Sequence, residues 1–220
     1  MHLCRAAATL LSAFTLIAAL PATAQAAPGD TVMQPVSEAL AGLPIQDEVR
    51  TGYSRDLFRH WIDADKDSCS TRAEVLLEEA VTAPEVGTRC SLTGGSWFSP
   101  YDSRTLTSAT QLDIDHLVPL AESWDSGARD WSAAERQAYA NDLDDARALI
   151  AVSAASNRSK ADQDPSTWMP QNAGYHCEYL TTWVAVKTRW GLSVDQAERD
   201  ALAGGLAGCP DAVIEVTLAR

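Results

Sequence analysis

The sequence predicts an α+β fold in which a few short strands are set among helices. Residues 111–120, QLDIDHLVPL, alternate apolar and polar side chains, as a half-buried strand does. Residues 148–153, ALIAVS, form a second apolar run of strand length. Residues 178–190, EYLTTWVAVKTRW, have apolar residues at helical spacing and are followed by Gly191, which is typical of a helix end.

The remaining elements are shorter. Residues 27–44 contain three prolines and are predicted to be an extended segment that leads into a single domain, residues 45–220. Ser132 and Glu135 have the spacing of a capping box at a helix N-terminus. Helices are therefore predicted over residues 53–61, 72–80, 132–139, from 157 onward, and over 194–205 with Ser193 as its N-cap.

The first 26 residues have the pattern of a secretory signal peptide. An arginine precedes an apolar, alanine-rich run, and small residues follow, with cleavage expected after Ala24 or Ala26. A membrane anchor is the alternative, but the run is shorter than the ~20 residues that a spanning helix needs. We therefore expect an extracellular protein that has no membrane association after cleavage and is a monomer.

Four cysteines remain once Cys4 is removed with the signal peptide. An even number of cysteines in an exported chain indicates disulfides, and three pairings are possible. We favour Cys69 with Cys90 and Cys177 with Cys209, because each pair closes a short loop.

The formal net charge of the whole sequence is −13. Such a surface repels a polyanion at long range, so a protein of this composition that acts on nucleic acid needs metal cations or a local basic patch.

Polar residues in the first strand and after the second strand suggest a hydrolytic site. Asp113, Asp115 and His116 interrupt the apolar pattern of residues 111–120, and Asn157 follows residues 148–153. Histidine can remove a proton from water near neutral pH, and carboxylate and amide oxygens suit Mg²⁺. Successive strand residues point to opposite faces, so Asp115 and His116 share a site only where the strand bends or ends.

The two segments DIDHLVPL and NRSKAD resemble the HNH endonucleases, which have a ββα-metal core of two strands and a helix. Further stretches are similar to small exported actinobacterial members related to the C-terminal domain of GmrSD-type restriction enzymes, namely WFSPY, DHLVPLAESWDSGA, YAND, AVSAASNRSKADQDPSTWMP and WVAVK. The resemblance covers roughly residues 45–205. It implies an HNH core embedded among additional helices.

By this resemblance, His116 is the general base, while Asp115 and Asn157 bind Mg²⁺ or Mn²⁺. Asp113 is expected to support the site, and Arg158 and Lys160 to contact the phosphate or the adjacent strand. The middle Asn of the HNH pattern, which orients the base, is replaced by Ala148. Asn141 is the candidate to take over this orientation.

Residues 63–74, DADKDSCSTRAE, fit the twelve-residue calcium loop of EF-hands. The alternative is that the acidic residues only cap the helix that follows. Ser68 stands where the loop normally has Gly, and a disulfide at Cys69 also argues against calcium. The predicted ligands of a structural Ca²⁺ are Asp63, Asp65, Asp67, Cys69 through its carbonyl, Thr71 and Glu74.

Together these patterns predict a secreted, metal-dependent endonuclease that hydrolyses DNA with little sequence specificity, with RNA as a further candidate substrate. The alternative is a calcium-dependent extracellular binding protein on an HNH scaffold that has lost catalysis. Ala148 favours the alternative, whereas the intact Asp115, His116 and Asn157 favour the enzyme.

Overall fold

The structure is a computed structural model that describes residues 26–220. The predicted signal peptide, apart from its last residue, lies outside the described residues. No helix in the described part combines the length and the apolar composition that crossing a bilayer requires.

Two antiparallel strands and the helix after them form the centre of the α+β fold. Strand β7 (Leu112–His116) pairs with β8 (Leu149–Ser153), and Asp115 lies opposite Ile150. Helix α5 (Ala154–Lys160) follows β8 directly and packs against both strands. Its N-cap is Ser153, whose hydroxyl accepts a hydrogen bond from the Ser156 amide, so the helix begins three residues before the predicted start.

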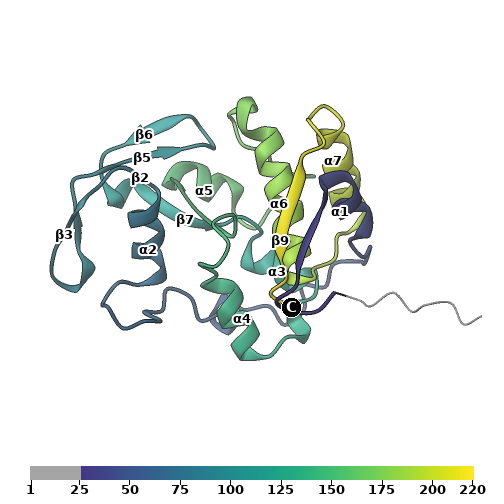
Figure 1. The fold of residues 1–220 in the computed structure, drawn as a ribbon, viewed down its shortest axis with the longest axis horizontal. Coiled ribbons are helices and arrows are strands. Elements are labelled where there is room, and N and C mark those ends of the chain that lie inside the picture. The colour runs from purple at the N-terminus through teal and green to yellow at the C-terminus, as the bar shows by residue number, and fades with distance from the viewer. Residues whose placement is uncertain (1–25) are drawn as a thin grey trace, which may run out of the picture.

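A helical layer covers one side of this centre (Figure 1). It consists of α6 (His176–Trp190), α7 (Gln196–Leu206) and α1 (Val36–Gly42), with the two-stranded sheet of β1 (Thr31–Pro35) and β9 (Val213–Thr217) beside them. The larger hydrophobic core lies here and includes Trp183, Tyr179 and Leu180.

Helix α2 (Thr71–Glu78) and a small sheet cover the other side (Figure 1). The sheet has the strand order β2 (Ala80–Thr82), β5 (Ser96–Ser99) and β6 (Arg104–Leu106), and a short pair, β3 (Glu85–Val86) and β4 (Leu92–Thr93), extends from it. A second core lies against β7 and β8, where Leu112 and Ile114 pack with Leu76 and Trp97.

The connection from β7 to β8 contains α3 (Leu120–Asp125) and α4 (Ala133–Ala140). The predicted capping box of α4 is present, because Ser132 and Glu135 exchange hydrogen bonds. A buried ion triad holds α3 against the helical layer: Lys187 lies 2.7 Å from Glu122 Oε1 and 2.6 Å from Glu198 Oε2. Short 3₁₀ turns complete the fold at Arg55–Leu57, Thr88–Cys90, Ala109–Gln111, Ala128–Asp130 and Ala173–Tyr175.

The prediction that residues 27–44 form an extended segment is wrong for residues 36–42. Strand β1 is extended, but α1 follows it, with Val36, Ala39 and Leu40 buried on one face. Pro35 immediately precedes the first residue of α1, a position where proline is compatible with a helix start. The prolines therefore mark the ends of elements, and this segment packs into the main core.

The helix predicted over residues 53–61 is also wrong, since only the 3₁₀ turn Arg55–Leu57 forms there. Side chains from elsewhere donate hydrogen bonds to carbonyls that a helix would use. Asn141 donates to the Arg59 carbonyl, and Arg136 donates to the Leu57 carbonyl. The calcium-loop sequence is consequently not flanked by two helices.

The N-cap of α7 differs from the prediction as well. Asp195 accepts the hydrogen bond from the Glu198 amide at 2.7 Å, whereas the Ser193 hydroxyl donates to the Ser126 carbonyl. The last helix therefore starts at Gln196, two residues later than predicted.

The structure contains both predicted disulfides. Cys69 is bonded to Cys90, and Cys177 is bonded to Cys209. The first ties the loop before α2 to the turn before β4, and the second ties the start of α6 to the residues after α7.

Candidate active site

Asp115 and His116 lie at the C-terminal end of β7, where the strand ends. A pocket of about 250 Å³ opens beside them, and both residues line it together with Asn157 and Arg158 from α5. The strand end allows the two neighbouring side chains to reach one pocket, as the sequence predicted. Lining residues outside the predicted set are Arg55, Ile114, Pro119, Leu120, Ala161 and Asp162.

The Asp115 carboxylate is buried and has two partners at one of its oxygens. Its Oδ2 atom accepts hydrogen bonds from Tyr101 Oη at 2.7 Å and from Lys160 Nζ at 2.6 Å. Burial raises the pKa of Asp115, and the attraction of Lys160 opposes this rise. Among the described residues, no hydrogen bond is made to Oδ1, so this oxygen is available for another ligand.

The side chain of Lys160, which was predicted either to contact the phosphate or to support the site, is directed at Asp115. Its side chain is fully buried, and its ammonium donates to Asp115 and to the His116 carbonyl. Burial lowers the pKa of Lys160, while Asp115 opposes this fall. Lys160 follows Asn157 by three residues on α5, so both side chains lie on the face toward β7, where Asn157 contacts Asp113 and Lys160 contacts Asp115. Lys160 therefore supports Asp115 from within the core.

The orientation of His116 is set by a backbone carbonyl. His116 Nε2 lies 3.0 Å from the Ala140 carbonyl oxygen, which can only accept, so Nε2 carries the proton and Nδ1 has a free lone pair. Ala140 is the last residue of α4, and the final carbonyls of a helix lack intrahelical partners. The end of α4 thus supplies the acceptor that fixes the tautomer.

Two aromatic rings lie on either side of the imidazole. The Trp61 ring is 5.3 Å from the His116 ring with an interplanar angle of 24°, and the Tyr139 ring is 6.4 Å away at 14°. Burial lowers the pKa of His116 to about 3, partly offset by the bond to Ala140. The imidazole is therefore neutral at neutral pH.

Asn141 does not orient His116, contrary to the prediction. Its side-chain oxygen accepts from the Ile62 amide and from the Thr71 hydroxyl, and its nitrogen donates to the carbonyls of Arg59 and Gln137. Asn141 thus ties residues 59–71 to α4. Ala148 contributes only its backbone carbonyl near the site, which accepts from the Leu117 amide.

Asn157 faces Asp113 across the pocket edge. Asn157 Nδ2 donates to Asp113 Oδ2 at 3.3 Å, and Arg158 Nε lies 3.7 Å from the same oxygen. The amide is thereby held with its nitrogen toward Asp113, which leaves Asn157 Oδ1 without a hydrogen bond among the described residues. Asp113 thus contacts Asn157 and Arg158, and its supporting role stays a prediction.

These oxygen donors suit a hard divalent cation. Asp115 Oδ1 and Asn157 Oδ1 both belong to pocket-lining residues, and neither has a protein partner in the described part of the chain. Mg²⁺ is commonly bound by one or two protein oxygens and keeps its other positions for water and phosphate oxygens. The residues present therefore fit the predicted metal.

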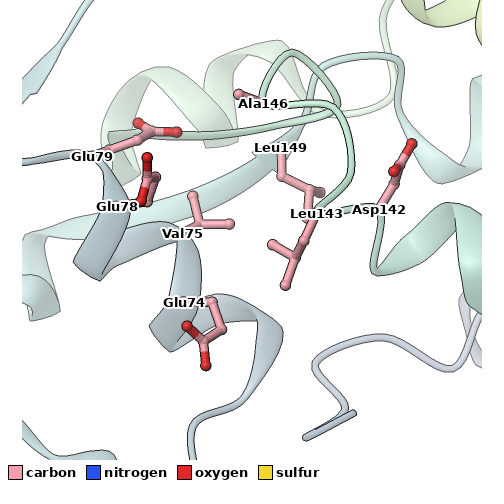
Figure 2. Close-up of a pocket in the computed structure, with 8 residues that line it drawn as sticks. All are labelled: Glu74, Val75, Glu78, Glu79, Asp142, Leu143, Ala146 and Leu149. Atoms are coloured by element: carbon pink, nitrogen blue, oxygen red, sulfur yellow. The ribbon is translucent and has the colours of Figure 1, made fainter. Parts of the chain in front are cut away.

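The charge around this pocket distinguishes it from a neighbouring one. Between α2 and the segment before β8, a second pocket is lined by several acidic residues and by no basic one (Figure 2). In contrast, Arg55 and Arg158 line the pocket at Asp115 and His116. Of these two pockets, only the one at Asp115 and His116 has cations that a phosphate could contact.

Three further residues at the site were not predicted from the sequence, namely Tyr101, Trp61 and Arg55. Tyr101 is the last residue of WFSPY, a stretch noted only for its resemblance. Trp61 and Arg55 lie far from the Asp-His pair in the sequence. Only the folding of the segment before α2 against α4 brings them to it.

The calcium-like loop has part of the expected geometry. Asp63, Asp65 and Asp67 each place a carboxylate oxygen within 4.8 Å of the other two. Ser68, at the usual Gly position, has a φ of 82° and donates its amide to Asp63 Oδ2 at 3.1 Å. The residue at this position thus adopts the left-handed conformation that Gly would favour.

The other predicted ligands of this loop differ in their availability. The Cys69 sulfur is in a disulfide, so only the Cys69 carbonyl remains. The Thr71 hydroxyl is bound to Asn141, which argues against Thr71 as a direct ligand. Burial and the three aspartates raise the pKa of Glu74, which places its carboxyl in their field.

The strand pair and the helix after it match the ββα arrangement expected of an HNH core, and Asp115, His116 and Asn157 line one pocket beside them. The family described as "GmrSD restriction endonucleases, C-terminal domain" matches residues 82–204, more than half of the chain. The chain belongs to this family, and the family indicates a nuclease-like function.

A relative from Arthroderma benhamiae (strain ATCC MYA-4681 / CBS 112371) is 42% identical over 201 residues, which cover 91% of this chain and 97% of the relative. That protein is named "Uncharacterized secreted protein". No solved structure matches the chain.

Proposed function

We propose that this protein is a secreted, metal-dependent endonuclease that hydrolyses phosphodiester bonds of DNA with little sequence specificity. The observation that carries the proposal is the meeting of Asp115, His116 and Asn157 at one pocket, with the Nδ1 atom of His116 free to accept a proton. Export is supported by the signal-peptide pattern, by the two disulfides and by the printed name of the relative.

In the proposed reaction, a water molecule attacks the phosphorus atom of the scissile phosphate. His116 Nδ1 accepts the proton of this water, while Ala140 and Trp61 hold the imidazole in place. Asp115 and Asn157 would hold Mg²⁺ or Mn²⁺, which would supply Lewis-acid stabilisation of the charge on the phosphate and the leaving oxygen. Arg158, whose side chain is 77% exposed, is placed to contact a phosphate oxygen.

We further propose that residues 63–74 bind Ca²⁺ in a structural role. The gathered carboxylates of Asp63, Asp65 and Asp67 and the turn at Ser68 support this assignment. The loop runs into the first turn of α2 and is tied to Asn141 at the end of α4, so its order affects the segment that carries Trp61.

The test of the proposed function is nicking of supercoiled plasmid DNA with Mg²⁺, Mn²⁺ or EDTA, followed by the same assay on an RNA of mixed sequence. Wild-type protein should nick DNA with metal and not with EDTA. Nicking that survives exhaustive chelation, or none under any metal condition, would contradict the proposal.

Three variants separate the roles of the residues. His116→Ala should lower turnover by a factor on the order of 10² to 10⁴, with partial rescue by imidazole and unchanged metal affinity. Asp115→Ala should weaken metal binding, measured by calorimetry, and Asn157→Ala should do so more mildly because its oxygen is neutral. His176→Ala is the matched control, since His176 bonds to the Pro170 carbonyl and does not line the pocket.

A further inference from the structure

The pocket at Asp115 and His116 has a second cation that comes from outside the family-matched region. Arg55 lies on the 3₁₀ turn Arg55–Leu57, well before residues 82–204, and lines the same pocket as Arg158. The two arginines thus reach one site from two separate elements, the turn and α5.

Arg55 is exposed, and its guanidinium makes no hydrogen bond or ion pair with any residue from 26 to 220. Several other arginines of the described chain use their N–H groups within the fold. Arg50 binds Asp125 at 2.6 Å, Arg72 donates to two carbonyls, and Arg189 binds Asp142. The donors of Arg55 are therefore available to an external acceptor.

The backbone of Arg55 is nevertheless fixed. The Ser54 hydroxyl caps the turn, and the Phe58 amide donates to the Arg55 carbonyl at 3.0 Å. The Phe58 ring is fully buried against Trp124 and Tyr139. The guanidinium of Arg55 is therefore exposed and unpaired, but it is attached to a backbone whose position is fixed.

The field of Arg55 reaches both central residues of the site. Its charge opposes the rise in the pKa of Asp115 and adds to the fall in the pKa of His116. A cation whose charge acts on both groups would also attract a phosphate bound between them.

We infer that Arg55 is a phosphate-binding residue of the active site, which together with Arg158 holds the nucleic-acid backbone over Asp115, His116 and Asn157. This inference rests on the proposed function. Guanidinium groups bind phosphate through two parallel N–H donors, and a protein with net charge −13 needs such local contacts to hold a polyanion. The segment before α2 is thereby part of the substrate site and not only a support for it.

The test compares Arg55→Ala, Arg55→Lys and Arg59→Ala. Arg59 is the matched control, because it is exposed, lies in the same segment, carries the same charge and does not line the pocket. Binding of a fluorescent DNA duplex is measured in EDTA at several salt concentrations, and kcat/KM for DNA cleavage is measured with Mg²⁺. Melting temperatures of all variants establish that they are folded.

Arg55→Ala should weaken duplex binding about ten-fold and reduce the slope of log K against log salt by about one, the change expected for one lost phosphate contact. The kcat/KM should fall by a similar or larger factor. Arg55→Lys should retain part of the binding, and Arg59→Ala should show the wild-type slope.

The inference is overturned where Arg55→Ala binds DNA with the wild-type slope, or where Arg59→Ala changes binding equally. Wild-type cleavage with no effect of Arg55→Ala overturns the inference but leaves the proposed function intact. Duplex binding that depends on Arg55 in a protein that never cleaves supports the inference and contradicts the enzyme. A wild-type protein that neither binds nor cleaves nucleic acid contradicts both.

Discussion

Asp115 and His116 are neighbours in the sequence but have different surroundings. Asp115 shares a strand face with Asp113 and is bound by Tyr101 and Lys160, whereas His116 is bound by the Ala140 carbonyl. Each side chain thus has part of its hydrogen-bonding capacity used by the protein and part left for the pocket. This division explains why a strand contains a carboxylate and an imidazole where apolar residues would pack more easily.

The buried pair of Asp115 and Lys160 predicts a large stability effect. Lys160→Met removes the cation and leaves Asp115 buried with Tyr101 as its remaining partner. The free energy of unfolding should fall by about 3 to 5 kcal/mol, measured by urea denaturation in EDTA. The double variant Asp115→Asn/Lys160→Met should regain part of this loss.

Arg158→Met serves as the control for that series, because Arg158 lies on the same helix with an exposed side chain. Its effect should stay within about 0.5 kcal/mol. Equal stability of Lys160→Met and Arg158→Met would show that the buried pair does not stabilise the fold as described.

The partly buried carboxyl of Glu79 should make the free energy of unfolding depend on pH. Glu79 follows α2, its carboxylate accepts from the Ala151 amide at 2.9 Å, and burial raises its pKa to about 7. The folded state therefore binds more protons than the unfolded state between pH 4.5 and 7, so this group's stabilisation is present at low pH and is lost as pH rises through 7.

Glu79→Gln removes this titrating group. The free energy of unfolding of the variant relative to wild type should be higher at pH 8 than at pH 5 by on the order of 1 to 3 kcal/mol. The measurement is urea denaturation of variant and wild type across this range. Glu78→Gln is the control, since Glu78 is the exposed neighbour at the same pocket (Figure 2). The prediction is contradicted if Glu79→Gln and Glu78→Gln differ from wild type by the same free energy of unfolding at every pH.

At the scale of elements, the site is assembled by helix ends and turns. Helix α4 contributes its last carbonyl to His116, and α5 contributes Asn157 and Arg158. The loop 63–74 contacts α4 through Asn141, which accepts from the Thr71 hydroxyl at 2.8 Å. The order of this loop is therefore connected to the segment that positions Trp61.

The proposed calcium loop predicts a ligand-dependent melting temperature. Millimolar Ca²⁺, at about 100 times the dissociation constant, should raise the melting temperature by roughly 5 to 10 °C, because the ion binds the folded loop. Glu74→Gln should abolish most of this shift, while Glu78→Gln, outside the loop, should preserve it. A wild-type shift retained in Glu74→Gln would assign the calcium effect to other residues.

At the scale of the whole molecule, the two disulfides fasten separate parts of the fold. Cys69–Cys90 holds the loop before α2, and Cys177–Cys209 holds α6 to the residues after α7. The strand pair β1–β9 adds a further connection between the two chain ends of the described part. The site lies between these fastened regions, close to neither disulfide in the sequence.

This arrangement predicts different consequences for the two disulfides. Cys177→Ser/Cys209→Ser opens a loop of sequence separation 32 and should lower the free energy of unfolding by about 3 to 4 kcal/mol, measured by urea denaturation. The rise in melting temperature on addition of Ca²⁺ should be unchanged in this double variant. Cys69→Ser/Cys90→Ser should be destabilised similarly and should also lose calcium affinity, and an identical calcium response in the two variants would contradict this assignment.

Elements that depend on local residue patterns could be predicted from the sequence alone. The alternation in residues 112–116, the capping box at Ser132, the helix ended by Gly191 and the favoured cysteine pairs all agree with the structure. The Asp-His and Asn segments were also recognisable, because their residue types and spacing carry the chemistry. Local propensity and short-range hydrogen bonds suffice for such features.

Contacts between residues distant in the sequence determine which groups complete the site. Lys160 was expected at the phosphate and lies in the core, and Asn141 was expected at His116 and holds residues 59–71 instead. Arg55 and Trp61 reach the pocket because a buried Phe58 fixes a segment that forms no helix. Burial and partner choice depend on contacts between residues distant in the chain, and the spacing of residues along a sequence does not encode those contacts.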